Sequence, residues 1–235
     1  MQQAENNFYL VSNELREQFS QQFLSADYWQ EQNAVVGTAQ GRGTTYFVQW
    51  QQQQWVLRHY YRGGLVGKLF KDGYLYTGLQ RTRAYQEFVL LDQLQQLALP
   101  APKPIACGVK RTGLTYRADI LTARIEHAQD LVGLLTNDNL DQVMWRNIGE
   151  TIAQFHRHGV FHHDLNCHNI LIDKDRKVWL IDFDQGEIKK PQQDWQQQNL
   201  ARLKRSFIKE LNRLPQFHWQ QTDFDALLAG YSSRI

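Results

Sequence analysis

Cysteine is scarce in this sequence, and long hydrophobic runs are absent from it. The only two cysteines among 235 residues, Cys107 and Cys167, are too few for a disulfide framework. No uninterrupted apolar run approaches the ~20 residues that cross a bilayer, and the polar residues 1–7 lack the apolar core of a signal peptide. We therefore expect a cytoplasmic protein with reduced thiols.

An excess of charge of one sign is also lacking. The formal net charge is +2, from 26 Lys and Arg against 24 Asp and Glu, which is too small to indicate a nucleic-acid partner. Hydrophobic residues make up 42% and charged residues 21% of the composition, which favours a globular chain over a disordered or membrane-embedded one. A chain of this length can bury a core without disulfide or metal support, as one large domain or two small lobes.

Proline is also scarce, and its distribution is informative. Three of the five prolines, Pro100, Pro102 and Pro104, lie within one short stretch. They follow residues 81–97, in which apolar side chains recur at helical spacing and which include Glu87. Because proline cannot continue a helix, we predict a helix over 81–97 and then an extended connection, which is the clearest linker in the chain.

Other elements follow from residue patterns on either side of this linker. Residues 35–61 are rich in β-branched and aromatic side chains around a glycine-rich turn, which predicts a hairpin. Residues 144–155 have helical spacing and lead to a glycine that suits a helix end. The apolar segments 169–172 and 178–181 flank a polar turn and predict an antiparallel hairpin. A further helix is expected over about 194–214.

The second hairpin should bring three polar side chains together. In an antiparallel hairpin the start of the first strand lies beside the end of the second, so Asn169 and Asp182 should meet, and the loop carrying Asp164 leads to the same end. Two carboxylates and an amide oxygen suit Mg²⁺ bound together with phosphates better than they suit zinc. Phosphoryl transfer needs such a metal and a carboxylate that receives the acceptor's proton. The sequence therefore predicts a phosphotransferase.

The same residues resemble the signature of kinases. His162-His163-Asp164-x4-Asn169 is similar to the kinase catalytic loop, and Asp182-Phe183-Asp184 is similar to the metal-binding Asp-Phe-Gly segment. The resemblance implies that ATP is the phosphate donor, that Asp164 is the catalytic base, and that Asn169 and Asp182 bind magnesium.

The kinase resemblance also implies an α+β, bilobal protein-kinase-like fold. We expect residues 1–119 to form a small N-lobe with an antiparallel sheet and one main helix, which contacts the nucleotide phosphates. Residues 120–235 are expected to form a mainly helical C-lobe that carries the catalytic loop, the hairpin and the metal site.

In the N-lobe, the resemblance implies that a glycine-rich turn containing Gly41 and Gly43 covers the phosphates and that a strand cation pairs with Glu87. The lysine that kinases have in this strand is absent, and Arg58 occupies its place, with Lys68 as the alternative. We favour Arg58, although a guanidinium group is not equivalent to an ammonium group. The two glycines by themselves would also suit an ordinary hairpin turn.

Two departures from protein kinases concern the substrate. Asn166 stands where protein kinases have lysine, and Asp184 stands where they have glycine, as in small-molecule and lipid-sugar kinases. No Ala-Pro-Glu element follows Asp182, so the large peptide-binding part of protein kinases is expected to be missing. These features disfavour a protein substrate.

Longer segments resemble the 3-deoxy-D-manno-octulosonic acid kinase family. They are residues 56–64, the His-His-Asp loop, residues 182–187 and residues 199–206, and together they span nearly the whole chain. This resemblance implies an ATP-dependent kinase that phosphorylates the 4-hydroxyl of the octulosonic acid on lipid A, during lipopolysaccharide inner-core biosynthesis. The alternatives are a lipopolysaccharide heptose kinase, a soluble kinase of aminoglycosides or choline, and a nucleotide-binding regulator without catalysis.

Such an acceptor is anionic and lies at a membrane surface. Basic residues in both lobes could attract it, and we expect the protein to bind peripherally on the cytoplasmic face of the inner membrane. A merely solvated basic surface is equally compatible with the pattern, and the oligomeric state is left open. The residues are Arg62, Lys68, Lys71, Arg81 and Arg83 in the N-lobe, and Arg202, Arg205, Lys209 and Arg213 in the C-lobe.

Overall fold

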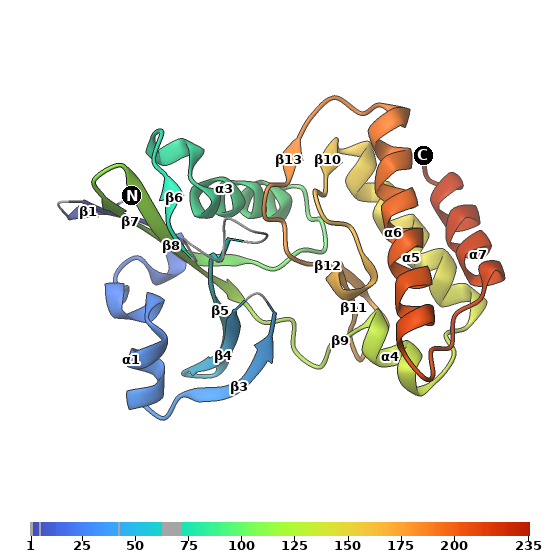
Figure 1. Ribbon diagram of the computed structural model, residues 1–235, viewed down its shortest axis with the longest axis horizontal. Coiled ribbons are helices and arrows are strands. Elements are labelled where there is room, and N and C mark those ends of the chain that lie inside the picture. The colour runs from blue at the N-terminus through green and yellow to red at the C-terminus, as the bar shows by residue number, and fades with distance from the viewer. Residues whose placement is uncertain (1, 5, 42, 63–71) are drawn as a thin grey trace. The chain divides into compact units, whose positions relative to one another are not determined.

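The computed structural model describes residues 2–4, 6–41, 43–62 and 72–235 (Figure 1). The chain divides into two compact units: the first consists of Met1–Asp92 and Pro102–Arg124, and the second of Gln93–Ala101 and Ile125–Ile235. The first unit ends beyond the predicted boundary between residues 119 and 120, because the strand that contains this boundary continues to Ala123.

The described residues of the first unit form an eight-stranded antiparallel sheet. Its strand order is β1-β2-β7-β8-β5-β4-β3, with β6 paired to β8. The prolines do end the preceding helix as predicted, but the last of them, Pro104, begins β7, which lies between β2 and β8 in the sheet. The strands are β1 (Gln2–Ala4), β2 (Asn7–Val11), β3 (Val35–Gln40), β4 (Thr44–Trp50), β5 (Gln53–His59), β6 (Tyr74–Leu75), β7 (Pro104–Thr112) and β8 (Thr115–Ala123).

One face of this sheet carries an aromatic core. Trp55 and Leu57 of β5 are buried against Phe23 and Trp29, which come from short helices near the N-terminus. The ring of Phe23 lies 5.4 Å from Trp29 and 4.7 Å from Trp50, so large apolar surfaces are removed from water in one cluster. The helices on this face are η1 (Asn13–Leu15), η2 (Gln21–Leu24) and α1 (Ala26–Glu31).

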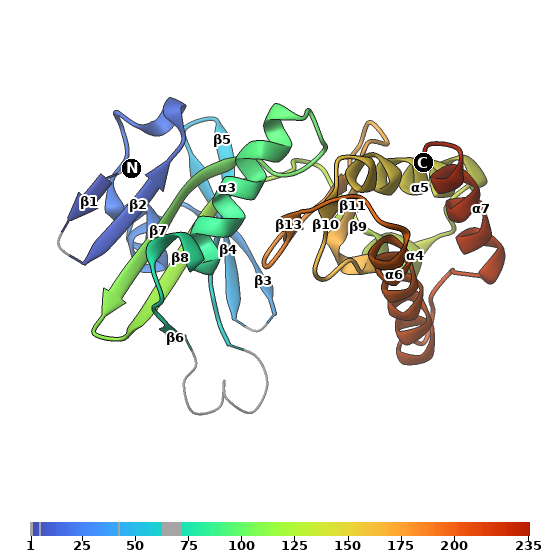
Figure 2. The same ribbon diagram turned by 90° about the horizontal axis from the view of Figure 1, so that it is seen from above.

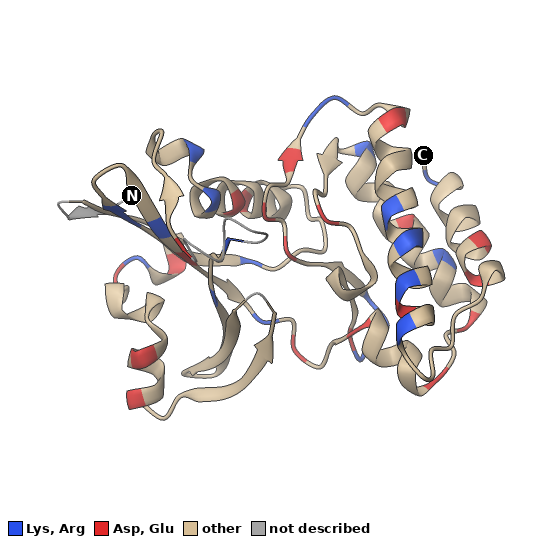
Figure 3. Ribbon diagram, viewed as in Figure 1, with Lys and Arg blue, Asp and Glu red and all other residues tan. Residues whose placement is uncertain are grey.

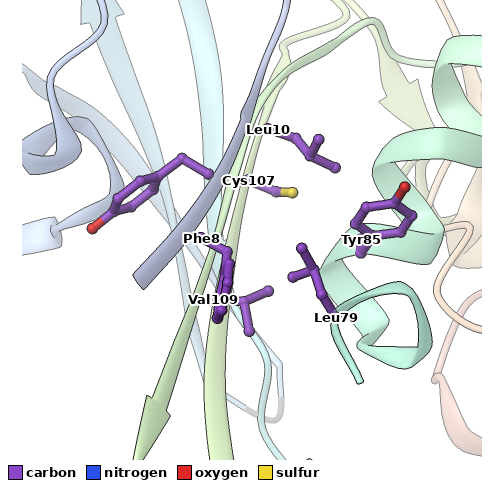
Figure 4. Close-up of a pocket in the computed structure, with 7 residues that line it drawn as sticks. Phe8, Leu10, Leu79, Tyr85, Cys107 and Val109 are labelled. Carbon is purple, nitrogen blue, oxygen red and sulfur yellow. The ribbon is translucent and has the colours of Figure 1, made fainter. Parts of the chain in front are cut away.

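The opposite face of the sheet is covered by α3 (Arg83–Gln96), which follows η3 (Leu79–Arg81) (Figure 2). Figure 4 shows Leu79 and Tyr85 facing Leu10, Cys107 and Val109 of the sheet. The helix agrees with the predicted range 81–97 to within two residues at each end. The apolar positions that predicted it are all buried: Ala84, Phe88, Leu91 and Leu94.

The second unit is mainly helical. The predicted helix over 144–155 is α5, which ends before Gly159, a residue with a φ of 74°. The buried His156 of α5 bonds Tyr231 of α7 at 2.8 Å, and burial lowers the pKa of this histidine to about 4. The helices are α4 (Leu131–Asn137), α5 (Gln142–Arg157), η4 (Cys167–Asn169), α6 (Gln193–Arg213) and α7 (Gln221–Ser232).

Short strands complete the second unit. The predicted hairpin is present, with β11 antiparallel to β12 and Ile170 opposite Leu180. The other strands are β9 (Gln129–Asp130), β10 (Val160–Phe161), β11 (Ile170–Ile172), β12 (Val178–Leu180) and β13 (Glu187–Ile188). These elements confirm the predicted α+β class. Among the described helices, none combines the length and the apolar character needed to cross a membrane.

Candidate active site

The predicted catalytic loop runs from β10 into η4 and is braced by a buried histidine. The backbone N–H of Asp164 donates to Nδ1 of His162 at 3.2 Å, and Nε2 of His162 bonds the carbonyl oxygen of Ile181 at 2.9 Å. Both contacts are satisfied by one neutral tautomer, with the proton on Nε2. Burial lowers the pKa of His162, which favours this neutral ring. The loop is thereby attached to the segment that precedes Asp182.

Asn169 is held so that its amide oxygen is available to a cation. Its Nδ2 donates to the carbonyl oxygen of Asp164 at 3.0 Å, which fixes the orientation of the amide. Its Oδ1 accepts no hydrogen bond from the described residues, although the residue is only 8% exposed. An oriented amide oxygen of this kind suits Mg²⁺.

Asp182 lies at the same end of the β11–β12 hairpin as Asn169. The N–H of Ile181 donates to the carbonyl oxygen of Asn169 at 3.0 Å, and Asp182 is the next residue. Asp182 has a φ of 61°, a left-handed conformation that aspartate tolerates better than most residues. The next side chain, Phe183, is fully buried, with its ring 4.8 Å from His162. The structure thus brings Asp164, Asn169 and Asp182 to one end of the hairpin, as predicted.

The donor set at this end fits magnesium bound with phosphates. In the described parts of the chain, no three His, Cys, Asp or Glu side chains are grouped so as to hold a metal ion. One carboxylate and one amide oxygen are a partial shell, and Mg²⁺ commonly completes such a shell with water and substrate phosphates. Asn169 and Asp182 are the residues that would hold the ion.

Helix α6 holds the catalytic loop along its length. The side chain of Asn199 bonds both backbone groups of His162, at 3.3 and 3.1 Å, and Ser206 accepts from the N–H of Cys167 at 3.0 Å. One turn further, Glu210 lies 3.4 Å from His168. Ser206 follows Asn199 by two turns and Glu210 follows Ser206 by one turn, so the three residues share one face of the helix. Sequence reasoning assigned them no role, although their polar spacing within an apolar helix face was a usable signal.

Asp164 itself is bound by an arginine of the same helix. Nε and Nη2 of Arg202 lie 2.9 and 2.6 Å from Oδ1 of Asp164. Sequence reasoning placed Arg202 only among the basic surface residues. Two others of that group also have partners, since Arg213 donates to Glu210 and Arg83 donates to the hydroxyl of Tyr74.

The first unit contains the predicted arginine–glutamate pair. Nη2 of Arg58 in β5 lies 2.5 and 2.6 Å from the two carboxylate oxygens of Glu87 in α3. The hydroxyl of Tyr60 donates to the same carboxylate at 2.6 Å. Glu87 is 3% exposed, and two donors compensate its buried charge.

The two predicted glycines lie at the turn between β3 and β4, in different surroundings. A Cβ on Gly43 would lie 2.0 Å from the ring of Tyr61, so a close aromatic contact requires glycine there. Among the described residues, the nearest atom to a Cβ on Gly41 would be the carbonyl oxygen of Gly43, at 3.8 Å. The alternative phosphate contact, Lys68, lies outside the described residues, as does Lys71.

A family model and several known proteins are similar to nearly all of this chain. The model of the "Lipopolysaccharide kinase (Kdo/WaaP) family" matches residues 26–231. The 3-deoxy-D-manno-octulosonic acid kinase of Vibrio parahaemolyticus is 51% identical over 219 residues, which are 93% of this chain and 91% of the relative. The kinase of the same name from Mannheimia succiniciproducens is 45% identical and covers 98% of each chain. That of Haemophilus influenzae (strain 86-028NP) is 44% identical and covers 97% and 98%.

Among solved structures, the Cydia pomonella granulovirus kinase PK-1 matches with a TM-score of 0.44 and 11% identity. The match covers 68% of this chain and 54% of that kinase. The family model and the three curated relatives lead to one conclusion: the chain belongs to the lipopolysaccharide kinase (Kdo/WaaP) family.

Proposed function

We propose that the protein is a kinase that uses ATP and Mg²⁺ to phosphorylate the 4-hydroxyl of 3-deoxy-D-manno-octulosonic acid on lipid A, in lipopolysaccharide inner-core biosynthesis. Relatives named 3-deoxy-D-manno-octulosonic acid kinase, which are 44–51% identical over most of the chain, support the substrate class. The convergence of Asp164, Asn169 and Asp182 at one end of the β11–β12 hairpin is the single observation that carries the chemistry.

In this proposal the second unit performs the transfer. The carboxylate of Asp164 accepts the proton of the acceptor hydroxyl as the hydroxyl oxygen bonds to the γ-phosphorus, and ADP leaves with the electrons of the broken bond. Asn169 and Asp182 would hold the metal ion. Bound there, Mg²⁺ would neutralise the charge of the phosphates.

The first unit is proposed to hold the nucleotide. Arg58 contacts the phosphates, and Glu87 with Tyr60 sets the direction of the guanidinium group. Gly41 is proposed to lie against the phosphates, because the nearest atom of the described residues is 3.8 Å from the position of its Cβ. Gly43 serves the same turn by admitting the ring of Tyr61.

We further infer peripheral binding at the cytoplasmic face of the inner membrane, where the acceptor lies. The exposed Arg205 and Lys209 of α6 have no ion-pair partner among the described residues, and Figure 3 shows basic positions repeated along this helix. Positive charge near an anionic surface is attracted to it. Vesicles containing anionic lipid should retain the wild type, and Arg205→Gln with Lys209→Gln should weaken retention. Retention that is independent of salt and of these charges would contradict the inference.

The catalytic proposal is tested by mass spectrometry of octulosonic acid–lipid A after incubation with the protein, ATP and magnesium. We expect one added phosphate, located on the octulosonic acid by fragmentation. Parallel incubations supply a heptose-containing lipopolysaccharide core, aminoglycosides and choline. Transfer only to one of these acceptors would assign the protein to an alternative substrate class. Binding of ATP without transfer to any of these acceptors would instead support a regulator.

A further inference from the structure

The catalytic loop contains no basic anchor for Asp164. Residues 162–169 include neither lysine nor arginine, and Asn166 stands where protein kinases have lysine. The side chain of Asn166 is already used inside the loop. Its Nδ2 donates to the carbonyl oxygen of Asp164 at 3.0 Å, and its Oδ1 accepts from the N–H of His168 at 2.8 Å, which caps η4. Asn166 therefore shapes the backbone but supplies no positive charge to the Asp164 carboxylate.

Arg202 supplies that charge from α6, 38 residues away in sequence. Two nitrogens of one edge of its guanidinium group point at one oxygen of Asp164: Nε is 2.9 Å and Nη2 is 2.6 Å from Oδ1. Among the described residues, no group bonds the other oxygen, Oδ2. One carboxylate oxygen is thus held by a charge-assisted contact, and the other can accept a proton.

The helix that carries Arg202 is fixed to the loop on both sides of this contact. Asn199, one turn earlier, bonds the backbone of His162, and Ser206, one turn later, accepts from Cys167. The apolar face of α6 is anchored by Leu203, which is completely buried. The arginine therefore approaches Asp164 from a backbone whose position relative to the loop is set by other bonds.

Arg202 and Asp164 have side chains that are 46% and 40% exposed. Ion pairs at such exposure contribute little to stability. This pair is better suited to orienting the carboxylate than to stabilising the fold. One edge of the guanidinium group contacts Oδ1, other bonds fix α6 to the loop, and Oδ2 is left to accept a proton.

We propose that Arg202 is the positioning residue of the catalytic base. It supplies the positive charge that the loop lysine supplies in protein kinases, where this chain has Asn166. It also holds Asp164 with Oδ2 directed to the acceptor hydroxyl. The inference rests on the proposed function, because Asp164 has a proton to accept only if the protein transfers phosphate to a hydroxyl.

The test compares Arg202→Gln, Arg202→Lys and a matched control, Arg234→Gln. Arg234 makes a similar exposed pair, with Nε 2.9 Å from Glu150, away from the catalytic loop. With octulosonic acid–lipid A as acceptor, Arg202→Gln should lower kcat on the order of 10²-fold, the scale of a misplaced catalytic group. The KM values of ATP and acceptor should stay near wild type. Arg202→Lys should recover part of kcat, and Arg234→Gln should match the wild type.

Two further results separate positioning from other roles. In the Asp164→Asn background, Arg202→Gln should cause no additional loss, because it acts only through Asp164. Unchanged thermal midpoints in all three single variants would exclude unfolding as the cause. The proposal is overturned if Arg202→Gln retains kcat, or if it raises only the acceptor KM, which would make Arg202 an acceptor-binding residue. A wild type without transfer to this acceptor would instead defeat the proposed function.

Discussion

Each of the two units contains an arginine–carboxylate pair among its predicted functional residues, but the surroundings of the two pairs differ. In the first unit Glu87 is 3% exposed and is bonded by both Arg58 and Tyr60. In the second unit Asp164 is 40% exposed and is bonded on one oxygen by Arg202. Removing one partner of a buried pair leaves an uncompensated charge, whereas an exposed pair contributes little to stability. Disruption of the first pair should therefore lower stability, and disruption of the second should lower the rate.

The largest effect on rate is expected for Asp164→Asn, which removes the proton acceptor. Loss of a general base lowers turnover by on the order of 10³-fold, and the exposed position predicts an unchanged urea midpoint. Transfer of radiolabelled phosphate from ATP and urea unfolding would be measured on the same preparation. A variant with wild-type turnover would refute the role of Asp164, and a strongly destabilised one would break the contrast between the two pairs.

The largest effect on stability is expected for Glu87→Gln, which removes the carboxylate charge that Arg58 and Tyr60 bond. Loss of a charge-assisted bond at a buried site should lower the free energy of unfolding by about 2 kcal/mol. Glu14→Gln is the matched control, because Glu14 pairs with Lys103 at 71% exposure and should change stability by less than about 0.5 kcal/mol. Equal urea midpoints for the two variants would show that burial does not distinguish the pairs.

Substitutions in the glycine turn of the first unit should have an intermediate effect on stability. Gly43→Ala should lower the free energy of unfolding by about 1 kcal/mol, because its Cβ would displace the ring of Tyr61. Gly41→Ala has open space and should leave stability unchanged, but it should raise the KM for ATP if this glycine lies against the phosphates. Thermal unfolding and ATP titration distinguish the two roles. An unaltered KM in Gly41→Ala would remove this glycine from the nucleotide site.

The smallest effect is expected for the pH-dependent contribution to stability of His168, which lies at the end of the catalytic loop. The hydrogen bond to Asp130 raises the pKa of His168, and Glu210 adds to this increase. The pKa of Glu210 itself is lowered, because its bonds to Arg213 and His168 outweigh the effect of its burial. Since the folded-state pKa is raised, the stabilisation is present below the ordinary value of about 6.5 and is lost as pH rises through the folded-state value.

The variant His168→Gln should therefore lose more stability at about pH 6 than at about pH 9. The loss of free energy of unfolding should stay below about 1 kcal/mol at either pH. Urea unfolding at the two pH values, with the wild type alongside, measures the difference. Equal loss at both values would mean that the ion pairs of His168 do not contribute and that only packing is affected.

The predictable part of the site came from the geometry of a short hairpin and from the kinase resemblance. Asn169 and Asp182 were placed together because a short hairpin with a polar turn determines its own register. Arg58 and Glu87 were paired through the kinase resemblance, and the structure brings them together. The partner of Asp164 was not found, because nothing in the loop specifies which helix faces it and Arg202 is one of several basic residues on α6.

The sequence by itself determined the helix near residues 144–155 and the hairpin over residues 169–181. The helix follows from apolar side chains at helical spacing, and the hairpin follows from two short apolar runs on either side of a polar turn. Tertiary structure alone decided that the segment after Pro104 is a strand between β2 and β8, and that α6 places Asn199, Arg202 and Ser206 along the catalytic loop. The physical reason is that periodicity defines the face an element buries, whereas the partner of that face depends on packing between residues distant in sequence.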